Sequence, residues 1–257
     1  PFPDLAIASG RRTASYLRAV KKASGGRTFT VFFKDPRCGA TTADFLWVPA
    51  HDRLRGANVL TTLTSPHRFS PERLATARAA PPHGLDRLAT PRVALIIGGD
   101  SAHFRFTPDA IADLAGRIAT LAGSGAALMA TTSRRTPPAL AAAIATIVQE
   151  AGGFFWDGTG ENPYPTLLAL ADALVVTADS VNMVGEAAAT GKPVLLYTPP
   201  GGSAKITAFL AGLEAAGATR PFTGALETYT YPPMDATPAI AVELARRYSI
   251  HRRALNL

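Results

Sequence analysis

Apolar and polar positions along the chain fall into two successive series of strand and helix patterns. Short runs of apolar residues predict buried strands, and apolar residues that recur every three or four positions predict helices. The first series predicts strands at 5–8, 29–33, 44–48 and 58–63, with one helix from residue 14 to the Gly25-Gly26 stop. The second predicts strands at 93–97, 127–130, 153–156, 173–177 and 194–197. Helices are expected at 108–121, from 137, at 164–170 and 183–189, after residue 202 and at 238–257.

Strands of continuous Val, Ile and Leu that alternate with helices are typical of parallel sheets covered on both faces. The pattern predicts an α/β protein with two Rossmann-like domains at 1–88 and 89–240, and a terminal helix at 241–257 that packs back on the first domain. The chain starts at Pro1 and enters an apolar run almost at once, so we expect the first domain to lack an upstream strand and helix.

Composition narrows the class of protein. Hydrophobic residues make up 47% and charged residues 18%, enough apolar surface for packed cores. The single cysteine, Cys38, cannot form an internal disulfide, which indicates a reducing, cytoplasmic compartment. No apolar run reaches the roughly 20 residues that a membrane helix needs.

Charge is distributed unevenly. Residues 1–90 hold 14 Lys and Arg against 6 Asp and Glu, whereas residues 91–257 hold 12 against 13. A basic first part favours an anionic partner: the inner face of a membrane, a phosphorylated or lipid-linked acceptor, or nucleic acid. No nucleic-acid-binding motif is present, so we exclude nucleic acid as a partner.

Two loops of the second domain follow predicted strands and could hold phosphate. Gly98-Gly99 would let backbone N–H groups approach a phosphate, and the alternative is a tight turn between strand and helix. Ser133 and Arg134 could grip a diphosphate, and the alternative is a helix cap with a solvated arginine. Neither loop is a P-loop or a G-x-G-x-x-G motif.

The most informative segment is 172–196, which predicts strand, polar loop, helix, Gly-Lys-Pro turn and strand. Ser180 and the helix-start amides of Asn182 and Met183 form a candidate anion site. Glu186, about one turn further on, could accept hydrogen bonds from two adjacent ribose hydroxyls, and the alternative is a solvated helix glutamate.

Several segments, taken in order, resemble the mitochondrial fission protein family, which has plant and bacterial members. They are residues 8–14 (ASGRRTA), 33–37 (FKDPR), 48–52 (VPAHD), 95–100 (LIIGGD) and 177–183 (TADSVNM). The resemblance implies a fold of the GT-B glycosyltransferase type and a nucleoside-diphosphate sugar as ligand, with a UDP sugar as the expected donor. It also implies chemistry without a metal or a tightly bound cofactor. Arg11 and Arg12 follow the first predicted strand and open a helix, so they could bind an anionic acceptor, and the alternative is a helix start with solvated arginines.

Candidate catalytic bases are few. Asp35 follows a strand, His51 precedes the carboxylate Asp52, and His103 lies near Gly99. No His or Cys cluster has metal-ligand spacing. The sequence favours a glycosyltransferase, with a nucleotide-sugar epimerase of the same fold or a non-catalytic adaptor on a membrane surface as alternatives.

Overall fold

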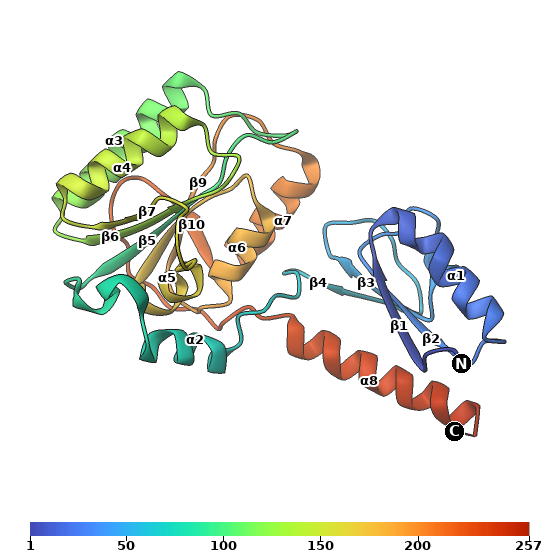
Figure 1. Cartoon of the computed structure of the whole chain (residues 1–257). Coiled ribbons are helices and arrows are strands. Elements are labelled where there is room, and N and C mark those ends of the chain that lie inside the picture. Colours follow the sequence, from blue (N-terminus) through green and yellow to red (C-terminus); the bar gives the residue numbers. More distant parts are fainter. Residues whose placement is uncertain (257) are drawn as a thin grey trace. The chain divides into compact units, whose positions relative to one another are not determined.

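The computed structural model describes residues 1–256, which form two compact units (Figure 1). The first combines Pro1–Pro66 with the segment that starts at Asp235, and the second is His67–Met234. The boundary therefore lies at residue 66, rather than near residue 88 as the sequence predicts.

The first unit contains a four-stranded parallel sheet in the order β1-β2-β3-β4. Its strands are β1 (Leu5–Ser9), β2 (Phe29–Phe33), β3 (Phe45–Pro49) and β4 (Val59–Thr62). Because every neighbouring pair is parallel, the carboxyl ends of all four strands lie along one edge. That edge carries the loops in which the sequence predicts acceptor-side residues.

Successive residues of a strand face opposite sides of the sheet, so both faces present apolar side chains. One helix covers each face. Helix α1 (Ala14–Ala23) buries Leu17 against a cluster that includes Phe32 and Leu46. Helix α8 (Thr237–Ala254) buries Ile240 against a cluster that includes Trp47. The last helix of the chain therefore completes the core of the first unit.

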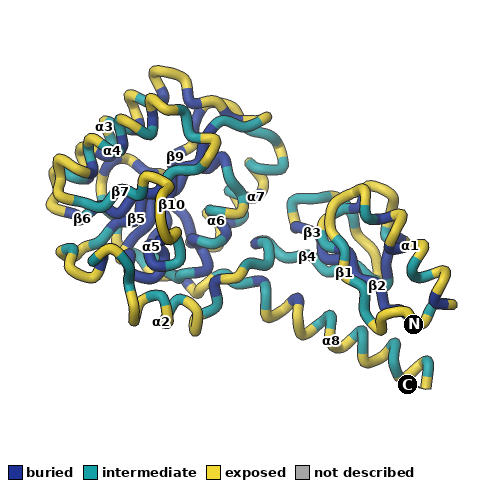
Figure 2. Tube along the Cα trace, in the orientation of Figure 1, coloured by how far each residue is buried: buried dark blue, intermediate teal, exposed yellow. Residues whose placement is uncertain are grey.

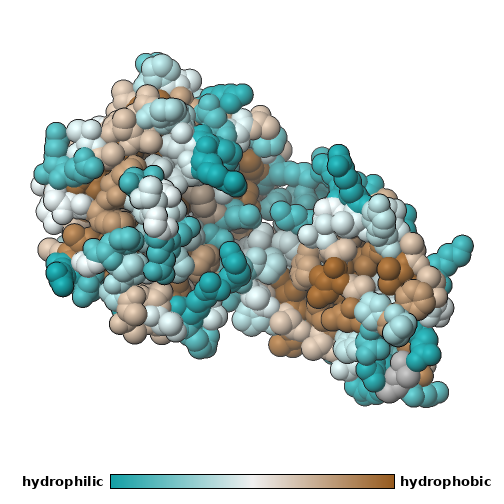
Figure 3. Space-filling model, in the orientation of Figure 1, coloured by the Kyte–Doolittle hydropathy of each residue, from teal (hydrophilic) through white to brown (hydrophobic). Residues whose placement is uncertain are grey.

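Exposed large hydrophobic side chains, among the described residues, all belong to the first unit. Figure 3 shows apolar surface over this unit, where β1 is an edge strand. The exposed large hydrophobic side chains are Phe2, Ile7, Tyr16, Val242 and Ile250.

The second unit contains a six-stranded parallel sheet in the order β10-β9-β8-β5-β6-β7. Its strands are β5 (Arg92–Ile97), β6 (Ala127–Thr132), β7 (Phe154–Trp156), β8 (Ala173–Thr177), β9 (Val194–Tyr197) and β10 (Thr219–Pro221). The chain builds outward from β5 to β7 and then returns to place β8 on the other side of β5. The order reverses between β5 and β8, and ligands of open α/β sheets bind at the carboxyl ends of such strands.

Helices cover both faces of this sheet (Figure 1). Helices α3 (Pro108–Gly123) and α4 (Pro138–Glu150) bury Leu114 and Ile144 against one face. The other helices are α5 (Tyr164–Leu170), α6 (Val181–Ala188) and α7 (Ala204–Ala215). Figure 2 shows buried strands between helices whose outer sides are exposed. This is the doubly covered sheet that the apolar strands predict.

Helix α2 (Pro71–Ala79) lies in a segment where the sequence analysis predicts no helix. Ser70 caps its start by accepting a hydrogen bond from the Arg73 amide. Arg78 of α2 donates to the carbonyl of Ala169 at the end of α5, and Lys192 donates to the same carbonyl. These contacts place α2 in the second unit and explain the shifted boundary.

We predict that Ile240→Ala destabilises the first unit by about 2–5 kcal/mol, because Ile240 is 3% exposed and leaves a cavity when shortened. Denaturant unfolding followed by the fluorescence of Trp47, with Trp156 replaced by Phe, measures the change. The control is Val242→Ala on the same helix, which is 70% exposed and should change stability by less than about 0.5 kcal/mol. Equal effects of the two variants would show that α8 does not pack on the sheet.

Candidate functional site

The candidate site lies at the carboxyl ends of β5 and β8 in the second unit. Three loops begin at this edge: residues 98–107 after β5, 133–137 after β6 and 178–180 after β8. Most of the predicted donor-side residues lie in these loops or at the start of α6. Their arrangement depends on a carboxylate that the sequence analysis passed over, Asp179.

Asp179 is a wholly buried acceptor, with a side chain that is 0% exposed. Its Oδ2 accepts hydrogen bonds from the amide of Gly99 at 3.0 Å and from Nη2 of Arg135 at 3.1 Å. Its Oδ1 accepts from the hydroxyl of Thr177 at 2.7 Å. One carboxylate thus connects the loops that follow β5, β6 and β8.

Gly98 and Gly99 are required by close packing around this carboxylate. A Cβ at Gly98 would lie 2.2 Å from Oδ1 of Asp179, and one at Gly99 would lie 2.1 Å from the backbone of Arg135. The Gly98 amide donates to Thr177 Oγ1 at 2.7 Å. Both amides that the sequence assigns to a phosphate are therefore hydrogen-bonded inside the protein.

The loop after β6 is held by its own hydroxyl groups. The Ser133 Oγ accepts from the Arg135 amide, and Thr136 Oγ1 accepts from the Ser133 amide. Arg135 also donates to the carbonyl of Asp100 at 2.8 Å. Both arginines are exposed, but Arg135 pairs with Asp179, whereas Arg134 makes no salt bridge among residues 1–256. Of the two arginines, Arg135 braces the loop and Arg134 remains accessible at its surface.

Helix α6 begins at the carboxyl edge, directly after the buried carboxylate. Ser180 is its N-cap and accepts a hydrogen bond from the Met183 amide at 3.4 Å. Asn182 is exposed, and Met183 and Ser180 are partly buried. The start of an α-helix carries a partial positive charge, so this end of α6 favours an anion.

Glu186 lies about one and a half turns into α6 and is partly buried. The hydroxyl of Tyr164, the first residue of α5, donates to its Oε2 at 2.7 Å. Phe69 packs edge-on against the Tyr164 ring, with centroids 5.5 Å apart. Glu186 therefore projects toward the starts of α5 and α2 and is not a solvated helix residue.

Burial raises the pKa of Glu186 above its usual value. The hydrogen bond from Tyr164 and the positive charges of His67 and Arg68 oppose that rise. Burial and the Glu186 charge also raise the pKa of Tyr164, which keeps the phenol protonated as a donor. A partly buried carboxylate that is oriented by one hydrogen bond can accept further hydrogen bonds from hydroxyl groups.

The predicted acceptor-side and catalytic residues divide between the units. Arg11 and Arg12 form a short 3-10 helix after β1, and both are exposed. Asp35 accepts a hydrogen bond from the Arg37 amide at 2.8 Å, in the loop after β2. His51 follows β3 and is partly buried, whereas His103 is an exposed residue of the second unit. Their catalytic roles stay predictions.

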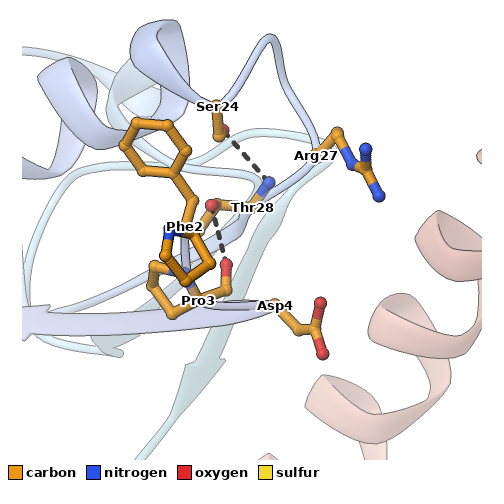
Figure 4. Close-up of a pocket in the computed structure, with 7 residues that line it drawn as sticks. Phe2, Pro3, Asp4, Ser24, Arg27 and Thr28 are labelled. Atoms are coloured by element: carbon orange, nitrogen blue, oxygen red, sulfur yellow. Dashed lines mark hydrogen bonds between the residues drawn. The ribbon is translucent and has the colours of Figure 1, made fainter.

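A pocket of about 290 Å³ lies elsewhere in the first unit, at the amino end of β1 (Figure 4). Thr28 Oγ1 donates to the carbonyl of Pro3, and the Thr28 amide donates to Ser24 Oγ. The pocket contains none of the predicted site residues. Over residues 1–256, no cluster of three His, Cys, Asp or Glu side chains could hold a metal ion. In the same range, no helix is both long and apolar enough to cross a membrane.

We predict that Asp179→Ala lowers the stability of the second unit by about 3 kcal/mol or more, because it leaves buried donors unsatisfied. Thermal or denaturant unfolding followed by Trp156 fluorescence measures this. Asp113→Ala is the matched control, since its pair with Arg117 is exposed and should contribute less than about 0.5 kcal/mol. A loss for Asp179→Ala no larger than that of the control would contradict the bracing role.

We also predict a pH-dependent gain in stability for Glu186→Gln. Because burial raises the pKa of Glu186, ionisation costs stability as the pH rises through that pKa, and glutamine avoids this cost. Unfolding at about pH 8 should show the variant more stable than the parent, and at about pH 4 the difference should shrink. A Glu186→Gln variant that is as stable as the parent, or less stable, at about pH 8 would contradict the idea that ionisation of Glu186 costs stability.

Comparison with known proteins shows the family to which the chain belongs. The profile of the family described as Mitochondrial fission ELM1 matches residues 1–248. The Mitochondrial fission protein ELM1 of Arabidopsis thaliana is 28% identical over 274 residues, which cover 95% of this chain and 64% of that protein. An uncharacterized protein of Rickettsia prowazekii (strain Madrid E) is 33% identical over 158 residues, covering 58% of this chain and 44% of the relative. The chain thus spans less than two thirds of the length of these relatives.

Among solved structures, a Listeria monocytogenes protein assigned as a UDP-N-acetylglucosamine 2-epimerase superposes with a TM-score of 0.51. The identity is 11%, over 97% of this chain and 68% of that one. MurG of Acinetobacter baumannii gives a TM-score of 0.48 at 15% identity, over 95% and 65%. The predicted fold class, α/β with two parallel-sheet units, is confirmed by the sheet topology and by the fold shared with the Listeria monocytogenes protein. With a family profile that matches residues 1–248, this chain belongs to the mitochondrial fission ELM1 family.

Proposed function

We propose that the second unit binds a nucleoside-diphosphate sugar, with a UDP sugar as the expected donor. The observation that carries the proposal is Glu186, a partly buried carboxylate beside the strands where the sheet order reverses. A carboxylate accepts hydrogen bonds and donates none, so it suits a pair of adjacent ribose hydroxyls. Tyr164 already donates to Oε2, which fixes the orientation of the group.

The diphosphate would lie at the start of α6. Ser180 and the Asn182 amide lie at that helix end, and Arg134 adds an exposed guanidinium from the neighbouring loop. The Met183 amide, which the sequence also assigns to the anion, already donates to Ser180 Oγ at 3.4 Å, and we leave it out. Ser133 would support Arg134 from within the loop. We leave the Gly98 and Gly99 amides out of this set, since Thr177 and Asp179 already accept their hydrogen bonds.

The proposed reaction is transfer of the sugar to an acceptor. An acceptor oxygen would attack the anomeric carbon as its proton passes to a base, and the bond from that carbon to the diphosphate oxygen would break. Helix-start amides and Arg134 would stabilise the charge on the leaving diphosphate. Asp35, His51 and His103 remain the candidate bases, and transfer of this kind needs no metal.

We predict that Glu186→Ala weakens binding of uridine diphosphate by about 1.5–3 kcal/mol, the scale of hydrogen bonds to a charged acceptor. Isothermal titration calorimetry with uridine, guanosine and adenosine diphosphates measures affinity and tests the base. Glu150→Ala, which removes an exposed carboxylate from α4, should bind like the parent.

Two results would overturn the proposal. A parent chain that binds no nucleoside diphosphate has no donor site, and a Glu186→Ala variant that binds like the parent has a donor site elsewhere. An assay of donor hydrolysis and transfer then separates enzyme from adaptor. An adaptor would bind nucleotide without turnover, and an epimerase would alter the sugar without releasing it.

A further inference from the structure

We propose that the carboxyl edge of the first unit's sheet binds a phosphate-bearing molecule through Arg11, Arg12, Lys34 and Arg53. This proposal deepens the proposed function, because such a molecule at this edge would be the sugar acceptor. Binding at this edge involves none of the donor-site residues, so the two sites can be tested separately.

The four cations come from loops that follow three adjacent strands. Arg11 and Arg12 follow β1, Lys34 follows β2 and Arg53 follows β3. Since the strands are parallel neighbours, roughly 4.8 Å apart, their loops share one edge and lie within reach of a single polyanion.

The other charges of this edge are already engaged. Arg37 pairs with Asp35 at 3.8 Å, and Arg55 donates to the carbonyls of Asp52 and Ala50. Arg11, Arg12, Lys34 and Arg53 are exposed and enter no salt bridge among residues 1–256. The loops of this edge also hold the carboxylates Asp35 and Asp52, so the six cations (Arg11, Arg12, Lys34, Arg37, Arg53 and Arg55) outnumber the carboxylates and the edge keeps a net positive charge.

The backbone of the middle loop is held in a costly conformation. Lys34 has φ +78° and Arg37 has φ +63°, values that non-glycine residues seldom adopt. The Lys34 amide donates a hydrogen bond to the Trp47 carbonyl at 2.7 Å, so Lys34 is held against β3 at the start of the turn. Such strain in ordered loops is found mostly at ligand sites, and here it falls on two basic residues of the cationic edge.

Phosphate is the chemistry that this edge fits. The planar guanidinium of arginine donates two parallel hydrogen bonds to phosphate oxygens, and two of the four residues are adjacent arginines. In Figure 3, hydrophilic side chains gather over the end of this unit where α1 begins. Because the cations are exposed, salt should weaken the binding strongly.

The test titrates the full chain with inorganic pyrophosphate and, separately, with vesicles that contain phosphatidic acid or only phosphatidylcholine. The site variant is Arg11→Gln with Arg12→Gln. The control variant is Lys22→Gln with Arg253→Gln, two exposed cations of the same unit away from this edge. We expect the site variant to lose at least about tenfold in affinity, the scale of one or two charged hydrogen bonds, and the control less than about twofold.

The outcomes distinguish a soluble phosphate compound from a lipid phosphate, and a site in the first unit from one in the second. Loss of pyrophosphate binding in the site variant supports a soluble phosphate compound, and loss confined to phosphatidic acid vesicles supports a lipid phosphate. Equal losses in site and control variants would overturn the proposal, as would no binding by the parent. If Arg134→Gln alone abolishes pyrophosphate binding, the anion lies in the second unit and this proposal fails while the donor site stands. If uridine diphosphate does not bind but the site variant still loses pyrophosphate, only the proposed function fails.

Discussion

The loops at the carboxyl edge of the second unit's sheet depend on the hydrogen bonds of the buried carboxylate of Asp179. At the point where strand order reverses, helices leave β5 and β8 on opposite faces, and nothing in the strand ladder holds the departing loops together. Asp179 supplies that connection by accepting from Gly99, Thr177 and Arg135. A buried carboxylate is tolerated only when its lone pairs accept hydrogen bonds. The three donors and the two neighbouring glycines are therefore needed together to accommodate Asp179.

This bracing separates structural groups from groups left for a ligand. The glycine amides and Arg135 take part in the brace, whereas Asn182 at the start of α6, Arg134 and Glu186 do not. Tyr164 has an intermediate role, since its hydroxyl orients Glu186 and its ring packs on Phe69. A rigid loop layer behind an accessible helix start is the arrangement that precise binding needs, because the ligand then orders few protein groups.

The sequence predicts nine of the ten described strands, and the most regular of them, such as β3, β5 and β8, are apolar runs buried on both faces. It misses β10 (Thr219–Pro221), because Thr-Arg-Pro is short and carries two exposed residues. It predicts Glu186 because a carboxylate among small residues stands out. Helix α2 is missed because its first turn depends on the Ser70 cap and its last on Arg78 meeting Ala169, and that carbonyl is 91 residues away. Asp179 is missed because a loop aspartate usually faces water. The signal was present, however: Thr177 ends a fully buried strand and Asp179 follows two residues later, at positions where a buried polar group needs a hydrogen-bond partner.

The order of the two units along the chain determines when each hydrophobic core can form. The second unit is one continuous segment, whereas the first is assembled from Pro1–Pro66 and the chain's last segment. Until α8 is present, the sheet face that holds Phe29, Val31, Phe45 and Trp47 has no helix over it. Burial of apolar surface is the main driving force for folding, so the first unit gains this half of its core only after the second unit has been passed. The cationic edge follows the same constraint, because its loops are fixed by the strands that α8 covers. Integrity of the last helix is therefore a condition for anion binding at the first sheet, although α8 contributes none of the proposed ligands.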